Sequence, residues 1–85
     1  MAGMNAVLAA QADDLDWRDV DSSNVAAAAY AHAFHRLFLR FKNGSEYAYE
    51  DVSLSEWASF VAAASKGRWV DRILKKGGYA YRKVR

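Results

Sequence analysis

Alternating apolar and polar side chains in the middle of the chain predict a β-hairpin. The stretch 36–41 (RLFLRF) puts Leu37, Leu39 and Phe41 on one side of an extended chain, which is the pattern of a half-buried strand. Asn43-Gly44 follows closely and is a strong signal for a tight turn between antiparallel strands. We therefore expect residues 36–41 to pair with the residues that follow the turn.

The length of that turn decides where Tyr47 and Tyr49 point, because a slip of one residue moves every side chain to the opposite face. A two-residue loop would put glutamates on the apolar face. A three-residue loop over residues 42–44, with the glycine in a bulge, sets Leu39 opposite Tyr47 and Leu37 opposite Tyr49. The apolar pattern favours the longer loop and predicts that both tyrosines lie mainly on the buried face. A base-stacking pair is the alternative.

A first helix is predicted after the hairpin. Ser53 and Glu56 have the spacing of a capping box, in which each side chain bonds to the backbone amide of the other residue. The apolar face of this helix consists of Trp57, Phe60, Val61 and Ala64. Gly67 suits the left-handed turn that ends many helices, so we expect the helix to stop there.

A second short helix is predicted over residues 68–75. Its apolar stripe consists of Trp69, Val70, Ile73 and Leu74, and its basic stripe of Arg68, Arg72, Lys75 and Lys76. Gly77-Gly78 ends the helix, and the alternation in residues 79–82 (YAYR) indicates a final edge strand.

The N-terminal part of the chain gives weaker signals. Residues 1–16 contain few spaced apolar side chains and are expected to be a flexible or frayed helical leader. Four consecutive alanines in residues 25–30 favour a helix over a strand, although pairing with neighbouring strands often overrides propensity. We expect a single α+β domain over residues 17–85: a small antiparallel β-meander of three to four strands with two short helices packed on one face.

Composition excludes several classes of protein. The 85 residues include no cysteine, so the chain has neither a disulfide scaffold nor a thiolate zinc site. No stretch has the pattern of a signal peptide or approaches the roughly 18 apolar residues of a membrane span. A cytoplasmic protein with no membrane contact is the expectation.

Charge is distributed unevenly along the chain. Residues 1–65 carry four basic and nine acidic side chains, whereas residues 66–85 carry eight basic side chains and a single acidic one. The basic residues near the C-terminus are interleaved with Trp69, Tyr79 and Tyr81. Nucleic acids need cations for their phosphates and aromatic rings for exposed bases. The candidate contacts are Arg68, Arg72, Lys75, Lys76, Arg82 and Lys83. The alternative is that these side chains merely solvate the outer side of a helix.

The other face of the 36–41 strand offers a second set of candidates. Phe38 lies there between Arg36 and Arg40, and the hairpin register pairs Arg40 with Glu46. Because the predicted helices cover only one face of the sheet, we expect Phe38 to be an exposed aromatic. Arg36, Phe38 and Arg40 are therefore included in the candidate binding surface.

The order and spacing of several short motifs along the chain match those of a known family. The motifs are Ser22-Ser23-Asn24-Val25, Tyr30, the strand at 37–41, Gly44, Tyr47-Ala48-Tyr49, Val52, Ala64-Ser65-Lys66-Gly67, Ile73 and Tyr79. In this order and spacing, from about residue 20 to 82, they resemble the KTSC domain, a small family found at the C-terminus of some lysyl-tRNA synthetases and alone in bacterial and phage proteins. Ala31 and Ser53 stand where that family often has Asp and Pro; Ser53 as an N-cap takes over the helix-starting role of proline. The resemblance implies the α+β fold, and nucleic-acid binding is the function usually suggested for the family.

Groups with catalytic or metal-binding chemistry are few. His32 and His35 are too few to bind zinc without cysteines, and Ser22 and Ser23 are interpreted as a turn motif rather than nucleophiles. No pattern provides nucleophile, base and orienting group together, so we expect no enzyme activity, no metal and no cofactor.

Two hypotheses for function follow. The first is a non-catalytic module that binds nucleic acid, RNA or a single strand, through the basic C-terminal helix and tail. The second is a protein-interaction module, in one version a phage or prophage product that binds and modulates a host protein, with charge complementarity selecting the partner.

Overall fold

The structure is a computed structural model that describes residues 3–85. The elements are α1 (Met4–Asp13), β1 (Arg18–Asp19), β2 (Val25–Ala31), η1 (His32–Phe34), β3 (Arg36–Phe41), β4 (Glu46–Tyr49), α2 (Leu54–Ala62), α3 (Lys66–Trp69), η2 (Val70–Lys75) and β5 (Tyr81–Lys83). The η1 segment is a short 3-10 turn, whereas η2 is a π-helical continuation of α3. No helix in this part of the chain is long and apolar enough to cross a membrane.

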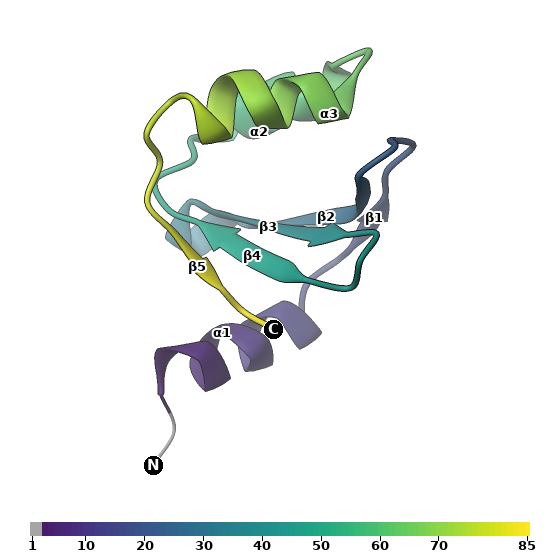
Figure 1. Ribbon diagram of the computed structural model, residues 1–85. Helices are drawn as coiled ribbons and strands as arrows, with labels where there is room; N and C mark the ends of the chain where they lie inside the picture. Colours follow the sequence, from purple (N-terminus) through teal and green to yellow (C-terminus); the bar gives the residue numbers. More distant parts are fainter. Residues whose placement is uncertain (1–2) are drawn as a thin grey trace.

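The strands form one antiparallel sheet in the order β1-β2-β3-β4-β5, so each strand pairs with its neighbours along the chain. Helices α2 and α3 cover one face of the sheet, and α1 crosses the other face (Figure 1). The expected α+β meander is confirmed. The sheet has five strands rather than three or four, because the short β1 and β5 both join it.

The hairpin between β3 and β4 has the predicted register. Leu37 lies opposite Tyr49 and Leu39 opposite Tyr47. The backbone amide of Phe41 donates to the carbonyl of Ser45 at 2.8 Å, which closes a three-residue loop, and Gly44 has a φ of 92°. That positive φ is the reason for glycine at this position. The longer loop is therefore confirmed.

The alanine-rich segment is a strand, against its helical propensity. β2 pairs with β1 on one side and β3 on the other, so its backbone amides and carbonyls are bonded along both edges. Its small side chains suit a position between two layers. Ala28 belongs to the core beneath α2 and α3, and Ala29 and Ala31 to the core beneath α1.

Capping explains where α2 begins. The Ser53 hydroxyl accepts a hydrogen bond from the Glu56 amide at 3.1 Å, and the Glu56 carboxylate accepts one from the Ser53 amide at 2.9 Å. The predicted capping box is thus confirmed. Trp57 and Phe60 are buried as expected. Val61, in the last turn of α2, is 37% exposed, and Ala64 is exposed beyond the end of the helix at Ala62.

The prediction that Gly67 ends the first helix is wrong. Gly67 lies in the first turn of α3, whose N-cap is Ser65. A Cβ atom at Gly67 would approach the Ser22 hydroxyl oxygen to 3.2 Å. Close packing against the loop before β2, rather than a left-handed turn, accounts for the glycine.

The core on the α2 side is rich in aromatic rings. Tyr30 stacks on Trp57 with ring centroids 5.4 Å apart, and its hydroxyl donates to the carbonyl oxygen of Val52 at 2.5 Å. Burial, with a smaller effect from Glu56, raises the pKa of the Tyr30 phenol. The neutral hydroxyl is the form that this bond requires.

A second core lies between the sheet and α1. Residues 4–13, expected within a flexible or frayed helical leader, form this helix, and its Leu8 and Ala12 are fully buried. They pack in one cluster with Phe38, Ala48 and Val84. Phe38 is 0% exposed, so the expectation of an exposed aromatic is wrong. Helix α1 covers the sheet face that was expected to be exposed to solvent (Figure 1).

Arg85 links α1 to the edge of the sheet. Its guanidinium bonds to the Asp13 carboxylate at 2.6 Å and to the buried Glu46 carboxylate at 2.9 Å. These hydrogen bonds raise the pKa of the Arg85 guanidinium. The chain after β5 and the end of α1 are therefore held together.

Candidate functional site

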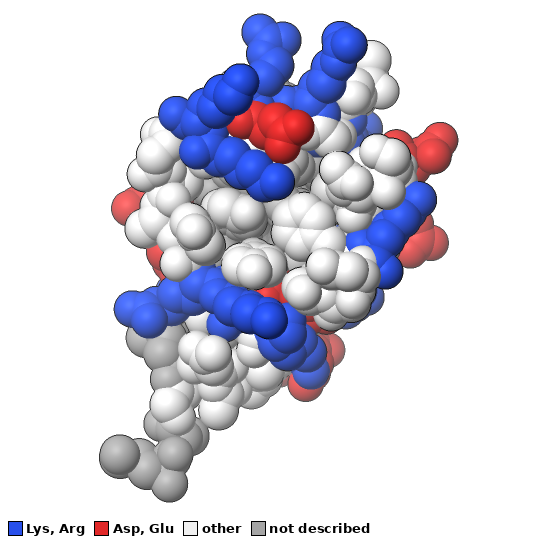
Figure 2. All heavy atoms as spheres, viewed as in Figure 1, with Lys and Arg blue, Asp and Glu red and all other residues white. Residues whose placement is uncertain are grey.

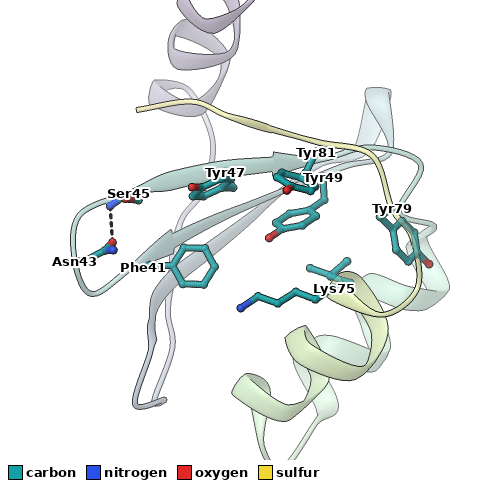
Figure 3. Close-up of a pocket in the computed structure, with 9 residues that line it drawn as sticks. Phe41, Asn43, Ser45, Tyr47, Tyr49, Lys75, Tyr79 and Tyr81 are labelled. Carbon is teal, nitrogen blue, oxygen red and sulfur yellow. Dashed lines mark hydrogen bonds between the residues drawn. The ribbon is translucent and has the colours of Figure 1, made fainter.

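A cleft of about 510 Å³ opens between the sheet and η2. Figure 3 shows aromatic rings from the strands along one side, with Lys75 extending from η2 toward Phe41. The lining residues are Phe41, Asn43, Ser45, Tyr47, Tyr49, Leu74, Lys75, Tyr79 and Tyr81. The volume is typical of a site for a small molecule or a single nucleotide, since such pockets measure roughly 300–1,000 Å³.

Strand register brings the rings together. Residues directly opposite in neighbouring antiparallel strands point to the same face, and Tyr49 is paired with Tyr81 across β4 and β5. The distance between ring centroids is 5.7 Å for Tyr49 and Tyr81, 6.0 Å for Tyr47 and Tyr81, and 5.9 Å for Phe41 and Tyr47. Rings from β3, β4 and β5 thus form a continuous aromatic wall.

The two tyrosines of the hairpin have different surroundings. Tyr49 is 5% exposed and belongs to the core, as predicted. Tyr47 is half-buried and packs against that core while it also lines the cleft. Burial, with smaller effects from Tyr47 and Tyr81, raises the pKa of the Tyr49 phenol. Its hydroxyl therefore stays protonated at neutral pH and remains able to donate.

Lys75 is the cation that lines the cleft. Its ammonium lies 5.9 Å from the centre of the Phe41 ring and 3.5 Å from the Asp71 carboxylate. Both partners of that ion pair are more than half exposed, so the pair is weak and exchanges readily with other anions. Lys75 is thus available to a bound anion.

Neighbouring basic residues of β5 point to opposite faces. Lys83 is paired with Tyr47, whose side chain lines the cleft, whereas Arg82 is paired with Ala48, which belongs to the core beneath α1. Because side chains alternate along a strand, Lys83 lies on the cleft face and Arg82 on the α1 face. Both are exposed.

The remaining basic candidates lie away from the cleft. Arg68 and Arg72 line a separate shallow groove of about 410 Å³ beside Trp69 and Ala63, and Lys76 is exposed just after η2. Figure 2 shows Lys and Arg side chains gathered over α3 and η2 and again along β5, with a band of uncharged side chains between them. The basic set is therefore split by the fold rather than arranged in one row.

Arg36 and Arg40 lie on the face that α1 covers. Arg36 donates to both carboxylate oxygens of Glu50 at 2.9 Å and to Gln11 of α1 at 2.6 Å. Arg40 bonds to Glu46 at 2.7 Å and lies 4.2 Å from the centre of the Trp17 ring. With Phe38 buried between them, this trio holds α1 and the sheet together. The expectation of an open sheet face for a partner is wrong, because that face is occupied by the chain itself.

Other candidate chemistry is sparse. Among residues 3–85, no group of three or more His, Cys, Asp or Glu side chains is placed to hold a metal ion. The Ser22 hydroxyl accepts hydrogen bonds from the amides of Asn24 and Val25, at 3.2 and 3.3 Å, which confirms the turn interpretation. His32 and His35 are exposed in the turn between β2 and β3.

Sequence reasoning missed part of the cleft. The sequence pattern places Phe41, Asn43 and Ser45 in the hairpin and Tyr81 in an edge strand among basic residues, and neither pattern indicates a cleft. The alternation in residues 79–82 indicated a strand, but its pairing with β4 was not evident because the two strands are far apart in the sequence. The signal for the cleft is visible only once that pairing is known.

Comparison with known proteins identifies the family. The family model of the KTSC domain matches residues 21–79. A protein of Tsukamurella paurometabola is 41% identical over 56 residues, which is 66% of this chain and 84% of that protein. The crystal structure of a KTSC domain protein from Yersinia pestis aligns with a TM-score of 0.75 at 29% identity and covers 84% of this chain and 99% of that one. The chain belongs to the KTSC domain family, and its family match begins after α1 and β1 and ends before β5.

Proposed function

We propose that this chain is a non-catalytic module that binds single-stranded nucleic acid in the aromatic cleft. The observation that carries the proposal is the wall of rings from β3, β4 and β5, with Lys75 on the η2 side and Lys83 at the sheet edge. No carboxylate lines this cleft in the described part of the chain. The site therefore combines the two requirements of a single strand, which are flat apolar surfaces for bases and cations for phosphates.

The same geometry favours a single strand over a duplex. Stacking of a base on an aromatic side chain contributes roughly 1–3 kcal/mol, but only an unpaired base exposes its face. Tyr81 is 62% exposed and Tyr47 is half-buried, so both rings are accessible from the cleft. A base placed against them leaves its phosphates near Lys75 and Lys83.

The proposal is tested by fluorescence anisotropy with labelled RNA and DNA strands of about ten nucleotides and with the matched duplex. Titrations at about 50 and 200 mM salt measure the contribution of phosphates, because each contact to a single strand contributes a slope of about −0.7 to the log–log plot. We expect single strands to bind more tightly than the duplex, with affinity falling as salt rises. Absence of binding to any strand at the lower salt would contradict the proposal.

Two neighbouring residues provide a matched pair of variants. Lys83→Glu places a negative charge on the cleft face and is expected to weaken binding and to reduce the magnitude of the salt slope by about 0.7, the contribution of one phosphate contact to a single strand. Arg82→Glu makes the same change of charge one residue away but on the α1 face. It is expected to have a much smaller effect at the higher salt, where the screening length is below about 8 Å. Equal losses in the two variants would place the site elsewhere.

A ring deletion tests stacking separately from charge. Tyr81→Ala removes an exposed ring without changing charge, and is expected to cost roughly 1–3 kcal/mol of binding free energy while the salt slope stays unchanged. Thermal melts of each variant establish that it is folded.

A further inference from the structure

The cleft has a polar end at the β3–β4 turn, formed by Asn43 and Ser45 (Figure 3). The side-chain oxygen of Asn43 accepts a hydrogen bond from the Ser45 backbone amide at 2.9 Å. A backbone N–H is only a donor, so this bond fixes which end of the carboxamide is oxygen. The NH₂ group of Asn43 is thereby the end left to a bound molecule.

The other charged or amide group in the lining is also a donor. The Lys75 ammonium donates only, and the lining contains no Asp or Glu among the residues that the structure describes. The hydroxyls of Ser45 and the tyrosines rotate and serve as donor or acceptor, so they do not discriminate between ligands. The Asn43 NH₂ and the Lys75 ammonium, which can only donate, therefore require hydrogen-bond acceptors on the ligand.

Bases differ in the polarity of their edges. At C4 of the pyrimidines and C6 of the purines, uracil, thymine and guanine carry a keto oxygen, which accepts, whereas cytosine and adenine carry an amino group, which donates. An amino group placed against the Asn43 NH₂ would leave two donors facing each other, so no direct hydrogen bond would form between them, whereas a keto oxygen at the same position would accept one.

We infer that the cleft selects bases with a keto oxygen at C4 of a pyrimidine or C6 of a purine over bases with an amino group at that position, with Asn43 as the residue that reads this edge of the base. The inference rests on the proposed binding of single strands and names the bases that the site takes. Uracil and cytosine provide the sharpest comparison, because they share ring size and stacking area and differ at the exocyclic group and the adjacent ring nitrogen.

The test is anisotropy with labelled oligo-U and oligo-C of about ten nucleotides at one salt concentration and neutral pH. We expect the wild-type protein to bind oligo-U about fivefold more tightly or better, which corresponds to the lower end of the discrimination found for base-edge contacts. Asn43→Asp retains an oxygen for the Ser45 amide and replaces the NH₂ donor by an acceptor. It is therefore expected to invert the U/C ratio while its extra negative charge weakens both affinities.

The outcomes separate this inference from the proposed function. Tight binding of both strands with a ratio near one overturns the inference and leaves the proposed function standing, as does a ratio that Asn43→Asp leaves unchanged. No binding of either strand overturns both. Asn43→Ala, which removes the amide, serves as a second variant and is expected to bring the ratio toward one. Asn43 is exposed in the turn, so circular dichroism and thermal melts are expected to match those of the wild type.

Discussion

Tyr49 is the most enclosed tyrosine of the cleft, and its ionisation links the site to the stability of the fold. Burial raises the pKa of its phenol in the folded chain, whereas in the unfolded chain the group titrates near its ordinary value of about 10. The stabilisation is fully present below that value and is lost as the pH rises toward the folded pKa, because the unfolded chain releases the proton first.

We therefore expect the free energy of unfolding to fall above about pH 10 and to fall less steeply in Tyr49→Phe. Urea denaturation at a series of pH values measures both slopes. Part of the decline persists in the variant because the pKa of Tyr30 is also raised by burial. Parallel curves for the two proteins would mean that Tyr49 does not carry the effect.

The orientation of some single residues could be predicted from the sequence, and that of others could not. The β3–β4 register followed from the apolar alternation and the requirement for glycine at position 44, both of which are local. Which of Arg82 and Lys83 faces the cleft depends on how β5 aligns with β4, and the sequence between them does not determine that alignment. The local pattern predicted that Tyr47 and Tyr49 share the buried face, whereas the addition of Tyr81 to them and the position of each cation depend on the pairing of β5 with β4.

At the scale of elements, capping sets the start of α2. Ser53→Ala removes the hydroxyl that accepts from the Glu56 amide, and the expected cost is about 1 kcal/mol of unfolding free energy, as for other N-cap serines. Ser55→Ala is the matched control, since Ser55 is exposed two positions further along the same helix and is expected to change stability by less than about 0.5 kcal/mol. Chemical denaturation measures both values, and equal effects would contradict the role of the cap.

Elements with small side chains were the hardest to predict. β2 is nearly all alanine, and its helical propensity is overridden by hydrogen bonding along both edges. α1 presents few large apolar residues, so its docking surface is not evident from periodicity, although alanines of the sheet leave space for a helix to approach. The pairing of Arg40 with Glu46 was predicted from the hairpin register and is confirmed. The contacts of Arg36 with Gln11 and of Arg40 with Trp17 were not predicted, because those partners lie far away in the sequence and were not expected to fold onto the sheet.

At the scale of the whole molecule, one strand belongs to two cores. Leu37 and Leu39 of β3 point toward α2 and α3, while Phe38 between them points toward α1, and all three are fully buried. The packing of α1 therefore supports the strand on which the aromatic wall is built.

Leu8→Ala is accordingly expected to destabilise the entire chain by about 2–5 kcal/mol, the usual cost of a leucine removed from a packed core. Val7, its neighbour on the same helix, is 55% exposed, and Val7→Ala is expected to change stability by less than about 0.5 kcal/mol. Urea denaturation followed by tryptophan fluorescence compares the two variants. A Leu8→Ala protein as stable as the wild type would show that α1 contributes little to the fold.

The position of β5 has a consequence for how the molecule folds. β2, β3 and β4 are joined by short turns, so their pairing closes small loops, which is fast and costs little entropy. β5 reaches β4 only after the whole of α2, α3 and η2 has been traversed, and it brings with it Tyr81, Lys83 and the link from Arg85 to α1. We therefore expect the cleft to be assembled late in folding, since the pairing of β4 with β5 is the most distant in sequence among the strand pairings of residues 3–85.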